Sequence, residues 1–386
     1  MDRSFVQQTL ADLVSIPSVN PTLSPEGHGE AEIGAYVLDL LVRLDLSVVK
    51  HEPEPGRVSV VGTLPGAGGG RSLMLNAHYD TVAVDGMAAP FDPQVRENRL
   101  YGRGAYDMKA SLAACIGAAK ALRDAKIRLA GDLLIAAVAD EEYASIGTAE
   151  VVRHHPVDGA IVTEPTDLAI CLAHKGFTWI EVETRGRAAH GSQHEIGIDA
   201  NLRMGRFLSE LAGLEQQLRT TRGKHPLVGS PSLHAAVLHG GTGLSTYAES
   251  SVVQIERRMI PGETPDQVET EIRTILDRIA MEDHGFEASM RTLLVREPFE
   301  VGPDSDIVTI SERSVTSVLG KPPALVGENP WMDSALLAAA GADTVVLGPS
   351  GAGAHAVEEW VDLESVFELT AILAEIARDY CRTPGD

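Results

Sequence analysis

The spacing of apolar residues divides the chain into helical segments and short buried strands. Apolar positions at helical spacing predict helices over residues 2–14, 30–46 and 363–376, and a further helix directly after Asp107. Short apolar runs predict strands over residues 58–62, 72–77, 132–139, 159–163 and 344–347. Because these strands alternate with helices, we expect an α/β fold whose mixed sheet is covered by helices on both faces.

The pattern changes between about residues 177 and 295. Alternating or strand-like runs at 177–184, 232–238, 251–258 and 287–295 are interleaved with helical patterns at 199–219 and 265–283. This βαββαβ order fits a small α+β unit inserted into a larger domain. We therefore expect a first domain formed by residues 1–176 and 297–386, and an inserted domain of residues 177–296. The helical positions Phe207, Leu208, Leu211 and Leu214 suit a core or an interface equally well.

Composition narrows the class of protein. The chain has 386 residues, of which 44% are hydrophobic and 4% aromatic, so it is long enough for about two globular domains. Its formal net charge of −23 opposes binding to nucleic acid or to an anionic membrane. No apolar run approaches the roughly 20 residues of a membrane span, and no signal sequence precedes the first helix. Three scattered cysteines predict neither a disulfide framework nor a thiolate metal site, which favours a cytoplasmic protein.

Histidines and acids stand where the predicted strands end. The run 73–77 leads into His78 and Asp80, 133–139 into Glu141 and Glu142, 160–163 into Glu164, and 344–347 into a glycine-rich loop with His355. In open α/β sheets, ligands bind beyond the carboxyl ends of the strands. Several uncompensated acids in one crevice would raise one another's pKa values, and bound divalent cations would remove that penalty. Histidine with Asp or Glu is a zinc-type ligand set.

Each of these residues also has an ordinary interpretation. A histidine at a strand end is usually a surface or hydrogen-bonded group, and Glu141 with Glu142 would suit a solvated helix start. Asp107 follows a glycine turn and precedes a helical pattern, so taken alone it is a helix N-cap. The joint placement of these residues at strand ends favours a metal site, with Asp107 as a further ligand.

Several motifs resemble one enzyme family over nearly the whole chain. They are HYDTV at 78–82, PFDPQVRENRLYGRGAYDMK at 90–109, DEE at 140–142, TEP at 163–165, GRAAHGS at 186–192, RRMIPGET at 257–264 and GAHAVEEWV at 353–361. The chain is similar to the zinc metallopeptidases and deacylases that include acetylornithine deacetylase, succinyl-diaminopimelate desuccinylase, aminoacylases and glutamate carboxypeptidases. The resemblance implies a phosphorylase/hydrolase-like catalytic domain with an inserted ferredoxin-like dimerisation, or lid, domain.

The resemblance also assigns roles to the strand-end residues. It implies two divalent ions bridged by Asp107, most simply Zn²⁺ although Co²⁺ or Mn²⁺ suit the same ligands. It places His78 and Glu164 on one ion and Glu142 and His355 on the other. Asp80 would orient the His78 imidazole, Glu141 would be the general base and acid, and the peptide bond after Asp107 would be cis.

In the middle segment the resemblance singles out two residues. His190 matches the family histidine that reaches the active site of the other subunit, which implies a homodimer. Arg258 matches the arginine that binds the substrate carboxylate. Without the resemblance, these would be a surface histidine and an exposed strand arginine.

The sequence departs from the family pattern where the substrate is expected. Thr242–Tyr247 replaces an Asn-Val-Pro-like segment, and Glu256 replaces an expected Asp. These changes disfavour a desuccinylase and leave an acetylornithine-type deacetylase, a broad N-acyl-amino-acid amidohydrolase and a dipeptidase or carboxypeptidase open. A two-zinc aminopeptidase would have no use for Arg258, and a binding protein that lost catalysis would not need Glu141. We expect a small N-acyl-amino acid or dipeptide as substrate.

Overall fold

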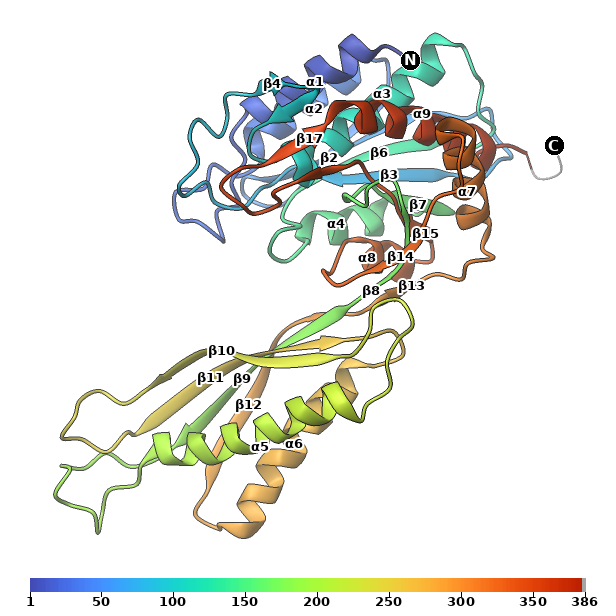
Figure 1. The fold of residues 1–386 in the computed structure, drawn as a ribbon. Helices are drawn as coiled ribbons and strands as arrows, with labels where there is room; N and C mark the ends of the chain where they lie inside the picture. Colours follow the sequence, from blue (N-terminus) through green and yellow to red (C-terminus); the bar gives the residue numbers. More distant parts are fainter. Residues whose placement is uncertain (384–386) are drawn as a thin grey trace. The chain divides into compact units, whose positions relative to one another are not determined.

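The computed structural model describes residues 1–383 (Figure 1). Its largest sheet is mixed. Among the described residues the sheet has nine strands in the order β1-β2-β6-β3-β7-β15-β8-β13, with β14 also paired to β8. Their bounds are Ser47–Glu54, Arg57–Leu64, Leu133–Val138, Leu73–His78, Gly159–Val162, Asp343–Val346, Ile170–His174, Phe299–Glu300 and Leu325–Glu328. The predicted mixed α/β sheet is therefore confirmed.

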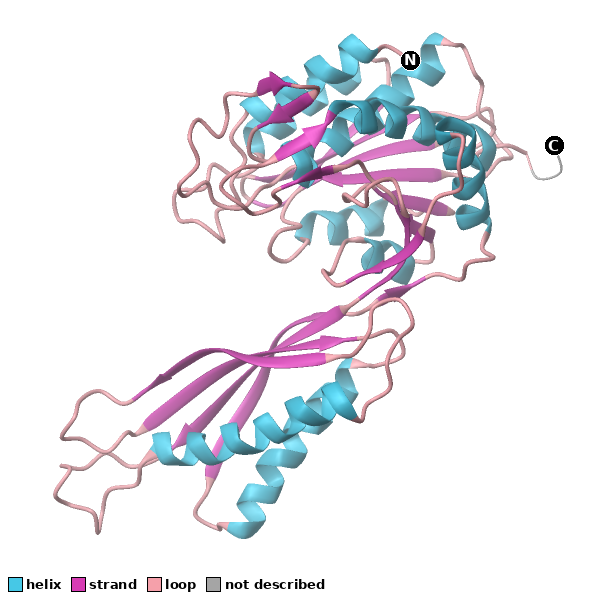
Figure 2. Ribbon diagram, viewed as in Figure 1, coloured by secondary structure: helices cyan, strands magenta, loops and turns pink. Residues whose placement is uncertain are grey.

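Helices cover both faces of this sheet, as Figures 1 and 2 show. One face carries α1 (Arg3–Ser15), α2 (Ala31–Arg43), α3 (Ala110–Asp124), α7 (Asp306–Leu319) and α9 (Leu363–Tyr380). The other carries α4 (Ile146–His154) and α8 (Ser334–Ala339). Every residue of β3 and β6 is buried, because helices exclude water from both sides of these central strands.

Small residues let the helices on the first face pack closely. α3 is rich in alanine and glycine, and most of its residues are buried. A Cβ atom at Gly117 would lie 2.6 Å from Cγ2 of Val6 in α1 and 3.0 Å from Cγ2 of Thr370 in α9. Glycine at this position therefore allows both helices to approach α3.

Clustering of contacts divides the chain into two units. Unit 1 contains Met1–Leu172, Val301–Val326 and the chain from Met332 onward, and unit 2 contains Ala173–Glu300 and Gly327–Trp331. The segment expected as an inserted domain, residues 177–296, lies within unit 2. A small antiparallel sheet in unit 1, with the order β16-β17-β5-β4, is formed by Gly351–Ala352, Trp360–Asp362, Arg99–Tyr101 and Gln94–Arg96.

Unit 2 contains an antiparallel sheet of the order β10-β11-β9-β12 and two helices. Its elements are β9 (Gly176–Arg185), α5 (Ala200–Thr220), β10 (Ser232–Gly240), β11 (Ser250–Met259), α6 (Pro265–Glu282) and β12 (Glu287–Arg296). The predicted βαββαβ order is confirmed. Phe207 and Leu211 are buried in the core of this unit, and Leu208 and Leu214 pack against it.

Some elements escape the sequence analysis. β1 is a mostly exposed edge strand, so it carries no continuous apolar run. α4 and α7 also have no counterpart among the predicted helices. All three cysteines are free and buried. No helix among residues 1–383 is long and apolar enough to cross a membrane.

Candidate metal centre

Parallel pairing brings four strand ends to one edge of the sheet. β3 pairs in parallel with β6 and with β7, and β15 pairs in parallel with β7. Their carboxyl ends therefore face the same way. His78 is the last residue of β3, Glu141 and Glu142 follow β6, and Glu164 follows β7. His355 lies farther along the chain after β15, in the turn between β16 and β17.

Asp107 lies between the two histidines of this edge. Its Oδ1 is 3.1 Å from Nε2 of His78, and its Oδ2 is 3.3 Å from Nε2 of His355. The interpretation of Asp107 as a helix cap is wrong: Lys109 occupies the N-cap position of α3, without a side-chain cap hydrogen bond. Asp107 instead belongs to a five-residue π turn, Ala105–Lys109, and the Asp107–Met108 peptide bond is cis as expected.

The remaining predicted ligands divide between the two ends of the Asp107 carboxylate. Oε1 of Glu164 lies 3.5 Å from Nε2 of His78. Oε2 of Glu142 lies 3.0 Å from Nε2 of His355. Glu141, whose Oε2 lies 4.0 Å from Nε2 of His78, completes the group. One ligand atom each from His78, Asp107 and Glu142, and one each from His78, Glu141 and Glu164, lie within 4.8 Å of one another.

Asp80 contacts the same edge in a different way from the one expected. Nδ1 of His78 is 3.0 Å from the backbone carbonyl oxygen of Asp80 and 3.6 Å from its Oδ1. The Asp80 carboxylate instead accepts hydrogen bonds from the backbone N–H groups of Glu141, at 3.0 Å, and Glu142, at 3.3 Å. The side-chain amide of Asn20 donates to Oδ2 at 2.8 Å. Asp80 therefore orients the turn that carries Glu141 and Glu142, while its main chain orients His78.

The sequence analysis missed two buried acids that border the centre. Glu359 accepts hydrogen bonds from the backbone N–H groups of Tyr106 and Asp107 at 2.9 and 3.0 Å, and thereby holds the π turn. Its place in the motif GAHAVEEWV is the signal that could have revealed it. Asp333 is buried and accepts a hydrogen bond from Thr148. No sequence pattern around Asp333 distinguishes it from an ordinary helix-start acid.

Burial and mutual repulsion control the charges in the centre. Burial, reinforced by Glu164, raises the pKa of Glu141 well above its usual range, and burial likewise raises the pKa of Glu164. Burial and Asp107 raise the pKa of Glu142 to about 7. Burial alone would raise the pKa of Asp107, but hydrogen bonds from His355 and His78 outweigh it and lower that pKa.

The histidines respond in the opposite direction. Hydrogen bonds to Asp107 and Glu142 raise the pKa of His355 to about 10. Burial would lower the pKa of His78, but Glu164 and Asp107 raise it well above its usual range. Among the described residues, the ion pairs of Asp107, Glu141, Glu142 and Glu164 all involve these two imidazoles. This surplus of carboxylates fits divalent cations. The cations would take the place of protons on the carboxylates and on the imidazoles.

His190 and Arg258 both lie in unit 2. Nδ1 of His190, an exposed side chain, is 2.8 Å from Oγ of Ser192. Nε of Arg258 donates to Oε1 of Glu256 at 2.7 Å, and its guanidinium lies 5.2 Å from the centroid of the Phe177 ring. Glu256, the residue that departs from the family pattern, is thus the partner of Arg258.

Sequence comparison decides the family. Residues 74–379 match the family described as peptidase family M20/M25/M40, which is more than three quarters of the chain. The chain belongs to peptidase family M20/M25/M40. As a family member it is a metal-dependent hydrolase of amide bonds.

Named relatives in this family act on different amides. The chain is 28% identical to an N-formyl-4-amino-5-aminomethyl-2-methylpyrimidine deformylase of Bacillus subtilis, over 93% of this chain and 92% of the relative. It is 30% identical to an acetylornithine deacetylase of Myxococcus xanthus, over 84% of each chain.

Solved structures share the fold. A tripeptidase from Staphylococcus aureus has a TM-score of 0.80 at 19% identity, covering 99% of each chain. A Bacillus subtilis protein described as a dinuclear metal-binding peptidase of family M20 has a TM-score of 0.74 at 16% identity, covering 98% of each chain. M20/M25/M40 enzymes bind a dinuclear metal site, and the described residues contain candidate ligand groups for one.

Proposed function

We propose that this M20/M25/M40 enzyme removes the acyl group from a small N-acyl-amino acid, with acetylornithine-like amides as the reference substrates. The observation that carries the proposal is the group of carboxylates and imidazoles around Asp107, with Glu141 beside it. The similarity to an acetylornithine deacetylase and to a deformylase supports acyl removal, since both relatives cleave a small acyl group from an amine.

The ligand assignment follows the contacts of Asp107. His78 and Glu164 would hold one ion, Glu142 and His355 the other, and Asp107 would bridge them. We propose Zn²⁺ for both positions, because imidazole and carboxylate ligands suit it. Bound as a pair, the ions would lower the pKa of a shared water and polarise the scissile carbonyl.

Glu141 is proposed as the group that moves protons. Its side chain is only 11% exposed, and burial reinforced by Glu164 raises its pKa above the usual range of a glutamate. The carboxylate would accept the proton of the attacking water at Oε2 and then donate it to the leaving amine nitrogen. Asp80 fixes the backbone of Glu141, so it would position this base without touching the substrate.

Unit 2 would supply recognition of the substrate and the dimer contact. We assign the α-carboxylate of the substrate to Arg258, and the oxyanion to His190 of a second copy of the chain. Arg258 would have to exchange its contact with Glu256 for the substrate carboxylate, and a guanidinium suits either partner. Light scattering during size-exclusion chromatography tests the homodimer directly: a single-chain mass at micromolar concentration would remove the basis for the His190 assignment.

A substrate panel tests the proposed function. Purified protein with added Zn²⁺, Co²⁺ or Mn²⁺ would be offered N-acetylornithine, other N-acetyl and N-formyl amines, N-succinyl-diaminopimelate and dipeptides. We expect the highest kcat/KM for an N-acetyl-amino acid and complete loss of activity with a chelator. Preference for dipeptides would transfer the assignment to the peptidase alternative. Absence of chelator-sensitive hydrolysis on the whole panel would contradict an enzymatic function.

A second comparison isolates the role of Arg258. Each active substrate would be compared with its α-carboxyl methyl ester, in the wild type and in Arg258→Met. We expect esterification and the substitution each to raise KM by about 10-fold, and expect no further loss when they are combined, because both remove the same ion pair. Equal KM values for acid and ester in the wild type would refute this role.

A further inference from the structure

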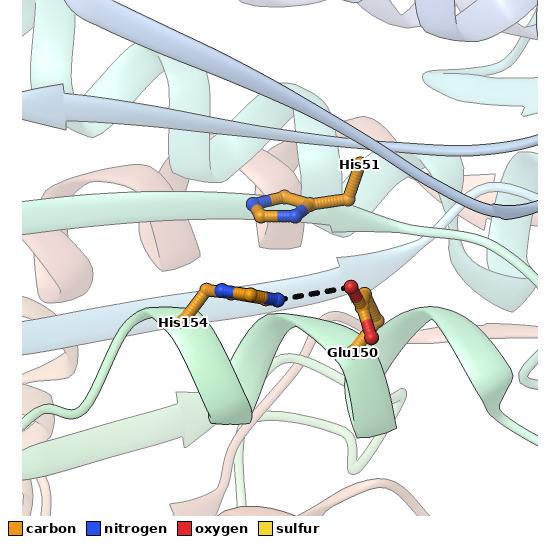
Figure 3. Close-up of side chains that lie close together, drawn as sticks. All are labelled: His51, Glu150 and His154. Atoms are coloured by element: carbon orange, nitrogen blue, oxygen red, sulfur yellow. Dashed lines mark hydrogen bonds and ion pairs between the residues drawn. The ribbon is translucent and has the colours of Figure 1, made fainter.

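A second cluster of metal-type ligands lies outside the candidate metal centre. His51 lies on β1, while Glu150 and His154 lie four residues apart on α4 and so share one face of that helix. Figure 3 shows the His51 ring over His154, with Glu150 beside both. His155 follows directly after α4. None of these residues has a part in the proposed amide hydrolysis.

The side chains of the cluster are already close together. Nε2 of His154 is 3.0 Å from Oε1 of Glu150, a contact drawn in Figure 3. The rings of His51 and His154 are stacked, with centroids 5.2 Å apart. One ligand atom each from His51, Glu150 and His154 lies within 4.8 Å of the others. Tetrahedral Zn²⁺, with ligands at about 2.0–2.2 Å, separates them by roughly 3.4 Å, so modest side-chain rotations would suffice.

His155 gives His51 a partner of the kind that metal-bound histidines use. The Nε2 atoms of His51 and His155 are 2.8 Å apart, so one of them must carry the shared proton. If His51 Nε2 donates this proton to His155, Nδ1 of His51 keeps its lone pair. A ligating histidine usually donates its other ring N–H to such a partner, which fixes the ring and its tautomer.

The cluster also has an alternative explanation that needs no metal. Arg153 lies 3.1 Å from Oε2 of Glu150 and competes for that carboxylate. Basic side chains in the last turn of a helix also interact favourably with its dipole. These effects explain the positions of Arg153 and His154 on α4. They do not explain why His51 and His155 approach from β1 and from beyond the helix end.

We propose that His51, Glu150 and His154 bind a third divalent ion of the Zn²⁺, Ni²⁺ or Cu²⁺ type, with His155 as the partner that orients His51. Imidazole-rich ligand sets prefer these ions to Ca²⁺ or Mg²⁺, which take oxygen ligands. The site is separate from the metal centre, because Glu142 precedes α4 and His154 ends it. A nine-residue helix spans about 14 Å.

The bound ion would link the edge strand β1 to helix α4. β1 is mostly exposed and pairs with β2 alone among the described strands. α4 connects the turn of Glu141 and Glu142 to the cluster, and its Thr148 donates a hydrogen bond to Asp333 beside the metal centre. An ion that joins His51 to α4 would therefore stabilise the helix that follows the catalytic turn.

Metal counting tests the proposal with Zn²⁺ as the probe. After equilibrium dialysis, bound zinc would be measured by mass spectrometry in the full chain and in His51→Ala/His154→Ala. We expect three ions per wild-type chain and two in the double variant, with kcat/KM changed by less than about twofold. His284→Ala removes an exposed histidine of unit 2 and should keep three. Equal zinc content in the wild type and the double variant would overturn the proposal.

A second measurement weakens the metal centre and guards against misfolding of the double variant. His154 is 54% exposed, so His154→Ala alone should fold normally. In an Asp107→Asn background, Zn²⁺ or Ni²⁺ should raise Tm, and His154→Ala should weaken this response by at least about 10-fold in metal concentration. Loss of a mere orienting partner already costs about 10–100-fold in affinity. An unchanged Tm response in His154→Ala would equally refute the third site.

Discussion

Two groups of buried acids in unit 1 differ in what balances their charge. Glu30 receives hydrogen bonds from Nε and Nη2 of Arg57 at 2.9 and 2.8 Å, and Arg57 also contacts Asp140 at 2.6 Å. Glu359 likewise pairs with Arg103 at 2.6 Å. The acids around Asp107 have two histidines instead. Both groups are buried, but in the part of the chain that the structure describes only the first is paired with permanently charged arginines.

The difference separates a structural role from a binding role. A bidentate arginine satisfies both oxygens of a carboxylate, so Arg57 and Glu30 form a closed pair. Burial and the nearby Asp80 raise the pKa of Glu30, and the hydrogen bonds from Arg57 oppose that shift. Among residues 1–383, no guanidinium opposes the raised pKa values of the metal-centre acids in this way. Burial of these carboxylates as charged groups remains unfavourable until cations bind, as expected of a metal-binding site.

Replacing the proposed base should have the largest effect. Glu141→Gln keeps the shape of the side chain but cannot accept a proton, so we expect kcat to fall by about 10²–10⁴-fold. Metal content should not change, and the free energy of unfolding should stay equal or rise because one buried like charge is removed. Steady-state kinetics measures the fall in kcat, and metal analysis checks that the metal content is unchanged. Glu32→Gln, at an exposed site on α2, is the control; activity within threefold of wild type in Glu141→Gln would refute the base assignment.

Replacing Arg57, which balances the charge of Glu30, should instead lower the stability of the fold. Arg57→Met leaves Glu30 and Asp140 buried without their guanidinium, so we expect the free energy of unfolding to fall by about 3–5 kcal/mol. Urea unfolding measures this change in the free energy of unfolding. Lys50→Met breaks an exposed ion pair with Glu52 and should cost less than about 1 kcal/mol. Equal effects of the two substitutions would mean that the buried pair is not a structural unit.

Asp107→Asn tests whether this residue is a ligand or a cap. Asp107 makes no cap hydrogen bond, so we expect metal affinity to fall by at least about 10-fold, while the metal-free protein loses the contacts with His78 and His355 but no helix cap. Asp362→Asn is the matched substitution, because Asp362 caps α9 by accepting from the backbone N–H of Glu364. That variant should bind metal normally and lose at most about 2 kcal/mol of stability. Titration calorimetry and urea unfolding distinguish these outcomes.

The sequence reveals the elements whose burial is uniform. β3 and β6 read as apolar runs because both their faces are covered, and α6 has an apolar face and a capping box formed by Thr264 and Gln267. β1 was missed because its mostly exposed residues leave no period to detect. The register and order of the strands depend on long-range pairing, for which a single sequence carries no signal.

The candidate site was predictable as a set of residues but not as a set of contacts. The strand ends point to His78, Glu142 and Glu164, since parallel strands must share an edge. The contact of the Asp80 carboxylate with the Glu141 turn depends on backbone geometry, which residue types do not encode. Asp333 was missed for the same reason, because it reaches the centre through folding of α8 and Thr148.

The stability of the metal-free protein should also depend on pH. Folding raises the pKa of Glu142 from 4.5 to about 7, so between these values the folded chain binds more protons than the unfolded chain. Folding also raises the pKa of His355 from 6.5 to about 10, which extends the same imbalance to higher pH. Stability falls with pH wherever the folded state holds more protons. Burial lowers the pKa of Lys109 from 10.5 to about 7, which opposes this decline above pH 7. The metal-free protein should therefore weaken most clearly between about pH 4.5 and 7.

Urea midpoints of chelator-treated protein at pH 5 and pH 7 check this direction, with the lower midpoint expected at pH 7. In the zinc-loaded protein the ions replace these protons, so the decline should be smaller. His355→Gln removes one contribution to the decline above pH 7, where Lys109 gives the opposite slope. Arg57→Met, which leaves the metal-centre acids intact, should lower the whole curve and make it steeper, because Glu30 loses the hydrogen bonds that lower its pKa. A metal-free midpoint that rises from pH 5 to pH 7 would mean that the acids around Asp107 are balanced after all, and the contrast between the two groups would fail.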